Sequence, residues 1–89
     1  MAWKIELSEH SERDLHKLDT PTRKRILKFL MLRLATLDDP RAIGHALQGQ
    51  RYENLWRYRV GDYRLICEIQ DEGLVILVVK IGHRREVYR

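Results

Sequence analysis

Leu55–Arg64, with the sequence Leu-Trp-Arg-Tyr-Arg-Val-Gly-Asp-Tyr-Arg, alternates apolar and cationic side chains as far as a Gly-Asp pair. Successive residues of a β-strand point to opposite faces of a sheet, so the aromatic residues and Val60 can enter a core. Arg57 and Arg59 then emerge together on the other face, and Arg64 arrives beside them on the next strand. The stretch therefore predicts a hairpin that carries its arginines on one outer face.

A second cationic group follows the last apolar run of the chain. Lys80–Arg89 reads Lys-Ile-Gly-His-Arg-Arg-Glu-Val-Tyr-Arg and places Tyr88 among several charges. The whole chain of 89 residues carries a formal net charge of +4, a sign that favours nucleic acid, acidic membrane or acidic protein as a partner. Because the cations gather in two short stretches, we expect the partner to be a polyanion.

The length and composition indicate one small domain that spans residues 1–89. A chain of this size buries about 60 to 65% of its unfolded surface, which is enough for one modest core. Its single cysteine, Cys67, excludes an internal disulfide, suits a reducing compartment and lies in an apolar pattern that favours a buried thiol. The first residues lack the features of a signal peptide, and the apolar run Leu74–Val79 is far shorter than the ~20 residues of a membrane helix. We expect a soluble cytoplasmic protein that makes no membrane contact.

The first half of the chain predicts a strand followed by two helices. Apolar residues alternate over 3–7, Ser8 is typical of a helix N-cap, and the first helix should end near Leu18. The Thr20-Pro21 pair restarts the helix, with the threonine as cap and the proline at the first helical position. The helical pattern then continues to about Leu37.

The predicted second helix is apolar around more than the usual stripe of about 100°. Its surplus apolar surface either packs entirely on the sheet and the first helix or leaves a groove open for a helix of a partner, and the sequence fits both. The basic residues of the two helices indicate a solvated face. The apolar set is Ile26, Leu27, Phe29, Leu30, Met31, Leu32, Leu34 and Ala35, and the basic set is Arg13, Arg23, Lys24, Arg25, Lys28 and Arg33.

The second half predicts an antiparallel meander. Residues 38–54 form a connecting loop with room for one turn of helix. The strands that follow are Leu55–Val60, Tyr63–Gln70 and Leu74–Ile81. Gly61 suits a tight type II′ turn, Gly73 can take the positive φ of a bulged hairpin, and the apolar last strand should be covered on both faces. The fold class is therefore α+β, with an N-terminal strand at a sheet edge, a two-helix hairpin and a three-stranded antiparallel meander.

Two segments resemble the RelE family of toxins within the RelE/ParE superfamily. They are Arg57–Leu65, which holds the Gly-Asp-Tyr-Arg hairpin, and Gly82–Tyr88, which holds Arg-Arg-Glu-Val-Tyr. The likeness spans nearly the whole chain and implies a RelE-like small domain that is the toxin of a type II toxin-antitoxin system. Members of that family are ribosome-dependent mRNA endoribonucleases, or mRNA interferases, that use no metal or other cofactor. They cut the message in the ribosomal A site by attack of a ribose 2′-hydroxyl on the neighbouring phosphate, leaving a cyclic phosphate and a 5′-hydroxyl.

The resemblance also assigns roles to individual residues. Arg57 falls where the family has a strand cation that acts near the 2′-hydroxyl. Arg64 and Arg84 fall at phosphate-binding arginines, and Tyr88 falls at the C-terminal tyrosine. Leu55 stands where some members have a further lysine, so a general base assigned there has no counterpart. The other cations of the two segments are assigned to RNA binding, and they are Arg59, Lys80, Arg85 and Arg89.

Physical chemistry supports such a set independently of the family. Guanidinium groups hold phosphate oxygens with a planar fork and can stabilise the charge that builds up during in-line attack at phosphorus. Arginine keeps its proton at any working pH, so another kind of residue must share the proton transfers. Tyr88 is the first candidate and His83 the second, although a histidine after Gly82 equally fits a solvated turn. The other histidines, His10, His16 and His45, share no metal-ligand spacing, so we expect no metal site.

Three functions remain open on the sequence. The first is the endoribonuclease, whose partners would be a cognate RelB-like antitoxin, the ribosome and mRNA, with DNA reached only indirectly through the antitoxin complex. The second is a ParE-like toxin that binds and inhibits DNA gyrase without chemistry of its own. The third is a small RNA-binding or antitoxin-sequestered module that has lost its toxicity. Convergence of Arg57, Arg64 and Arg84 on one face would favour the first.

Overall fold

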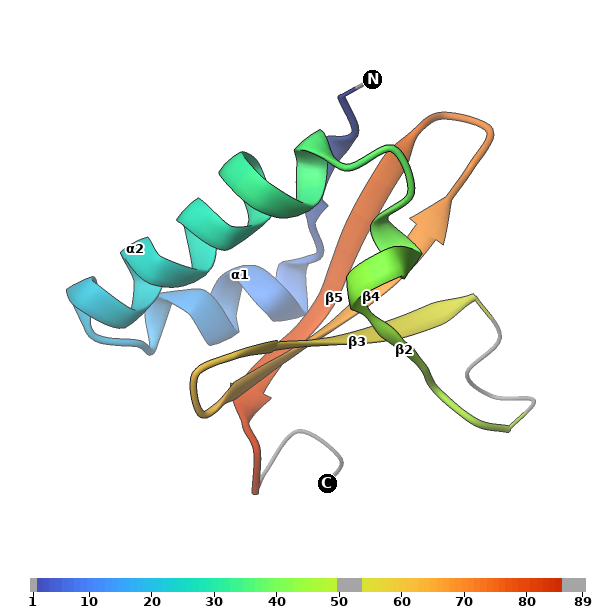
Figure 1. Ribbon diagram of the computed structural model, residues 1–89. Coiled ribbons are helices and arrows are strands. Elements are labelled where there is room, and N and C mark those ends of the chain that lie inside the picture. The colour runs from blue at the N-terminus through green and yellow to red at the C-terminus, as the bar shows by residue number, and fades with distance from the viewer. Residues whose placement is uncertain (1, 50–53, 86–89) are drawn as a thin grey trace.

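The computed structural model describes residues 2–49 and 54–85 and places both helices on one face of a five-stranded sheet (Figure 1). The strand order is β1-β5-β4-β3-β2, in which β1 pairs parallel with β5 and the other neighbours pair antiparallel. The strands are β1 (Lys4–Leu7), β2 (His45–Ala46), β3 (Leu55–Val60), β4 (Tyr63–Gln70) and β5 (Val75–His83). The α+β class and the edge position of the first strand are confirmed, and β2 is an additional strand within the segment predicted as a loop.

Each of the two helices has an N-cap side chain that accepts a backbone N–H of its first turn. α1 (Glu9–His16) is capped as predicted by Ser8, whose hydroxyl accepts a backbone N–H of the first turn at 3.0 Å. α2 (Thr20–Lys28) is capped by Asp19, whose carboxylate accepts a first-turn N–H at 3.3 Å. The prediction of Thr20 as cap is wrong because the carboxylate one residue earlier takes that role and leaves the threonine inside the first turn.

Helical structure continues beyond α2 as a π-helix, η1 (Phe29–Arg33), and a 3₁₀-helix, η2 (Leu34–Thr36). Together they complete the long helical segment that the sequence predicts. Its inner side is fully buried at Ile26, Leu30 and Leu34. Met31 and Leu32 are 55% and 71% exposed, so the sheet and α1 do not cover all of the apolar surface.

The core lies between the helices and one face of the sheet. The strands contribute the buried residues Tyr58, Leu65, Cys67, Ile76 and Val78, which confirms the buried thiol. Alternate residues of β5 on the other face stay half-buried. The prediction that this strand is covered on both faces is therefore wrong, because α1 and α2 lie over the same face (Figure 1). In the described part of the chain, no helix has the length and apolarity needed to cross a membrane.

The two hairpin turns differ in the residue that takes a left-handed backbone. Gly61 has a φ of 60°, as the first central residue of a type II′ turn requires. In the β4–β5 turn, Leu74 has a φ of 52° and donates its N–H to the Asp71 carbonyl at 3.2 Å. The expectation of a positive φ at Gly73 is therefore wrong, because this turn closes one residue later.

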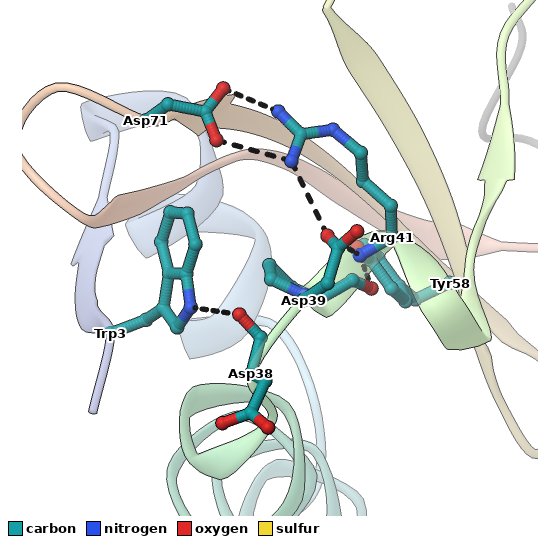
Figure 2. Close-up of polar contacts among 7 residues, drawn as sticks. Trp3, Asp38, Asp39, Arg41, Tyr58 and Asp71 are labelled. Atoms are coloured by element: carbon teal, nitrogen blue, oxygen red, sulfur yellow. Dashed lines mark hydrogen bonds and ion pairs between the residues drawn. The ribbon is translucent and has the colours of Figure 1, made fainter. Parts of the chain in front are cut away.

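Polar contacts fix the segment that connects the helices to β2 (Figure 2). The buried Tyr58 hydroxyl donates to the Pro40 carbonyl at 2.7 Å, where the 3₁₀-helix η3 (Pro40–Ile43) begins. Arg41 of η3 makes a bidentate ion pair with Asp71, with N–O distances of 3.2 and 2.6 Å. Gly44 then passes the Tyr58 ring so closely that a Cβ at this position would lie 2.8 Å from it. These contacts set β2 beside β3 at the edge of the sheet.

Candidate functional site

The cross-strand register places cations on the face of the sheet that the helices leave bare. Residues directly opposite each other in an antiparallel pair share a face. Arg59 of β3 lies opposite Arg64 of β4. Arg57 of β3 and Lys80 of β5 both lie opposite Ile66 of β4. Tyr58, between the two β3 arginines, points into the core, so the cations point away from the helices. We call this set the cationic face, and its members are Arg57, Arg59, Arg64 and Lys80.

Arg64 is held at the β3–β4 turn. Its Nη1 donates to the carbonyls of Gly61 and Tyr63 at 3.3 and 3.2 Å, and the side chain is half-buried. A guanidinium has five N–H donors, and these two bonds use Nη1 alone. Arg59 lies opposite on β3 and is exposed. The prediction that the hairpin arginines share one outer face is confirmed.

Arg84 lies at the same end of the sheet as Arg64. Its backbone N–H donates to the Asp62 carbonyl at 2.9 Å, which ties the segment after β5 to the β3–β4 turn. Arg84 and Arg85 are both exposed. The structure therefore brings the backbone of Arg84 to the hairpin that carries Arg57 and Arg64. Two further predicted site residues, Tyr88 and Arg89, lie outside the described residues.

His83 is separated from the cationic face. It lies opposite Tyr63, which in turn lies opposite the buried Val60, so all three share the face that carries the helices. The His83 and Tyr63 rings meet edge to face, with centroids 5.7 Å apart. Both residues line a 390 Å³ pocket that reaches Asp14 of α1. The sequence did not show this because β5 continues through His83, beyond the predicted strand end, and the continued alternation turns the imidazole inward.

A groove separates α2 and η1 from the β2–β3 edge. It has a volume of about 480 Å³ and combines apolar side chains with a cationic rim. Its apolar lining is Phe29, Leu32, Ile43 and Val60, and its polar lining includes Arg25, Lys28, Arg33, His45 and Arg59. We call it the α2–β3 groove. Several helix cations that the sequence assigned to a solvated face thus border this groove.

Comparison with known proteins decides the family. A model of the family described as ParE toxin of type II toxin-antitoxin system, parDE, matches residues 5–88. The chain belongs to the RelE/ParE toxin superfamily. It is 27% identical to Toxin RelG of Mycobacterium tuberculosis over 89 residues, which cover 100% of this chain and 99% of the relative. It is 29% identical to mRNA interferase toxin RelE of Escherichia coli over 90 residues, which cover 99% of this chain and 92% of the relative.

A solved structure shows the same fold. The toxin-antitoxin complex RelBE2 of Mycobacterium tuberculosis contains a chain that matches this RelE/ParE toxin with a TM-score of 0.84 at 24% identity. The match covers 97% of this chain and 95% of that chain. The RelE-like arrangement of an N-terminal strand, two helices and antiparallel strands is therefore confirmed.

The cross-strand register of this toxin places one further residue beside the cationic face, and the sequence did not point to it. His45 of β2 lies opposite Arg57, on the same side of the sheet as the cationic face. Its place depends on the contact of Gly44 with Tyr58, two residues far apart in the sequence, so no local pattern points to it. Within the described ranges, no three His, Cys, Asp or Glu side chains gather in a group that could hold a metal ion.

Proposed function

We propose that this type II toxin is a ribosome-dependent mRNA endoribonuclease that cuts the message in the ribosomal A site. The observation that supports the proposal is the placement of Arg57, Arg59 and Arg64 on the face of the neighbouring strands β3 and β4 that the helices do not cover (Figure 1). A polyanion that lies across this face meets guanidinium groups from two strands at once. Similarity to the mRNA interferase toxin RelE of Escherichia coli supports the same activity.

The proposed chemistry is attack of a ribose 2′-hydroxyl on the neighbouring phosphate, without a metal ion. Arg57 acts near the 2′-hydroxyl, while Arg64 and Arg84 hold the phosphate oxygens as negative charge accumulates on them. The products are a cyclic phosphate and a 5′-hydroxyl. The flanking phosphates are held by the other predicted RNA-binding cations, which are Arg59, Lys80, Arg85 and Arg89.

The proposal retains Tyr88 and gives His83 a lesser place. A phenol at Tyr88 would move a proton or stack on an exposed base. His83 stays the second candidate for acid-base chemistry, and its packing against Tyr63 on the helix-bearing face places it on the opposite side of the sheet from Arg57 and Arg64.

A reconstituted translation assay tests the activity. Purified ribosomes carrying a defined message are mixed with the toxin, and primer extension maps any new 5′ end. We expect a cut within the A-site codon and little cleavage of naked RNA, because the ribosome aligns the substrate and alignment alone is worth many kcal/mol. An intact message at saturating toxin would reject the endoribonuclease.

We also propose a RelB-like antitoxin, encoded beside the toxin, that places an acidic amphipathic helix in the α2–β3 groove. The exposed Leu32 offers an apolar contact, and Arg25, Lys28 and Arg33 offer charge complementarity. A segment in this groove would cover Arg59 and so block part of the cationic face. The toxin-antitoxin complex of the structurally similar RelBE2 supports a partner of this kind.

Two neighbouring substitutions test the groove. Leu32→Ser should weaken antitoxin binding by about tenfold or more, since an apolar anchor in a groove carries much of the binding energy. Met31→Ser is the control, because Met31 is also an exposed apolar residue of the same helical segment but does not line the groove. Affinities measured by isothermal calorimetry should differ between the two variants. Equal affinities would place the antitoxin elsewhere.

Gyrase inhibition is the second candidate function, because the matching family model describes a ParE toxin. A ParE-like toxin would inhibit gyrase by binding, without cutting RNA. Gyrase supercoiling measured with rising toxin concentration separates the two. We expect supercoiling to be insensitive to the toxin and the message in the ribosomal A site to be cut. We also expect the toxin to act in the cytoplasm, where ribosomes and gyrase are both found. Inhibited gyrase beside an intact message would support the second candidate.

A further inference from the structure

We propose that His45 is a second proton-transfer residue of this nuclease site beside Tyr88, where it accepts the proton of the attacking 2′-hydroxyl. The inference rests on the proposed endoribonuclease function. It adds to the arginines a side chain of a kind that can both accept and release a proton.

The register fixes where His45 lies. It is directly opposite Arg57 in the β2–β3 pair, and paired residues of antiparallel strands have Cα atoms about 4.5 to 5.5 Å apart. The N–H of Leu47 donates to the carbonyl of Leu55 at 3.1 Å, which continues the same pairing beyond β2. His45 is exposed and lines the α2–β3 groove together with Arg59. The imidazole therefore borders the two β3 arginines of the cationic face.

The core holds this short strand in place. β2 has only two residues, so its own pairing is a weak anchor. Gly44, immediately before His45, packs against the ring of the buried Tyr58, and the Tyr58 hydroxyl binds the Pro40 carbonyl at 2.7 Å. Tyr58 is itself the neighbour of Arg57 on β3. One core residue thus positions both His45 and the strand that carries the arginines.

The reaction needs a group that can gain and lose a proton. Guanidinium groups stay protonated, whereas imidazole is the side chain that changes charge between about pH 5 and 8. As the bond between the 2′-oxygen and phosphorus forms, a neutral His45 nitrogen takes the hydroxyl proton. The bond from phosphorus to the 5′-oxygen then breaks, and that oxygen takes a proton from water. The resulting hydroxide recovers the proton from the imidazolium, so the histidine returns to its starting state.

Among the described residues, the charged side chains that lie opposite His45 or line the groove beside it are all cationic. Arg57 and Arg59 face it from β3, and Arg25, Lys28 and Arg33 line the same groove from α2 and η1. Arginine and lysine side chains in general keep their protons at neutral pH. A rate that falls on the acidic side of neutrality would therefore report the imidazole among these neighbours.

Single-turnover cleavage on ribosomes tests the role with two variants. His45→Ala and His45→Gln should each lower the cleavage rate by about 10²-fold or more and change the half-saturating ribosome concentration by less than about twofold. His45→Gln should also lose the acidic fall in rate that the wild type shows. Imidazole added to the buffer should restore part of the cleavage by His45→Ala. His16→Ala, an exposed histidine of α1, is the matched control and should behave as wild type.

The outcomes separate this inference from the function on which it rests. Wild-type cleavage together with an unchanged His45→Ala rate would overturn the role of His45 alone. A slower His45→Ala variant with weaker ribosome binding, no imidazole rescue and an unchanged pH profile would make His45 a binding residue and also overturn it. Absence of cleavage by the wild type itself would reject the endoribonuclease.

Discussion

The Arg64 side chain has a structural role in the β3–β4 turn and a proposed role in binding the phosphate. Its Nη1 closes the β3–β4 turn through two carbonyls, and its place opposite Arg59 puts the guanidinium on the cationic face. Arg64→Ala should slow A-site cleavage by roughly 30- to 1,000-fold, which is about 2 to 4 kcal/mol of transition-state stabilisation. Arg13→Ala, which removes an exposed cation of α1, is the control for lost charge. Wild-type cleavage by Arg64→Ala would remove Arg64 from the phosphate site.

Tyr58 has a structural role that can be measured separately. Burial raises the pKa of its phenol, so the hydroxyl stays protonated and donates to the Pro40 carbonyl at neutral pH. Tyr58→Phe leaves that buried carbonyl without its donor and should lower the free energy of unfolding by about 1 to 3 kcal/mol. Urea denaturation measures the loss. An unchanged unfolding midpoint would show that this hydrogen bond does not stabilise the segment between the helices and β2.

At the scale of elements, the cap of α2 makes folding stability depend on pH. Hydrogen bonds from the side chain and backbone of Thr22 hold the pKa of Asp19 below its ordinary value of 3.8. A carboxyl with a lowered folded pKa stabilises the fold above its unfolded pKa and loses that contribution as pH falls through the folded value. The stability advantage of wild type over Asp19→Asn should therefore shrink below about pH 4. Urea denaturation from neutral to acidic pH checks this, and a constant advantage would contradict it.

The elements also show what the sequence can and cannot predict. Period-two and helical patterns predicted β1, β3, β4, both helices and the shared face of Arg57 and Arg59, because each depends on neighbours in the chain. β2 depends instead on Tyr58 meeting Gly44, and the inward turn of His83 depends on how far β5 pairs with β4. Both are long-range contacts that no local window contains. The functional surface is therefore visible in part from the sequence, while His45 emerges only from the fold.

At the scale of the whole molecule, Cys67 reports on cooperative unfolding. Its side chain is 0% exposed in the middle of β4, and burial raises the pKa of its thiol. Because the thiolate is the reactive form, a thiol reagent should modify the protein only at the rate of global opening. Mass spectrometry should show slow labelling in buffer and rapid labelling in denaturant. Rapid labelling in buffer would show that the core opens locally.

The whole-molecule claim is that position, rather than net charge, makes the cationic face the RNA site. Two double variants lose equal charge at different places, namely Arg59→Gln with Arg64→Gln on the cationic face, and Arg13→Gln with Lys24→Gln on the exposed helix surface. Primer extension on programmed ribosomes measures the rate of A-site cleavage for each. The account predicts that the cationic-face variant loses cleavage while the helix variant keeps the wild-type rate. Equal rates for the two variants would contradict it.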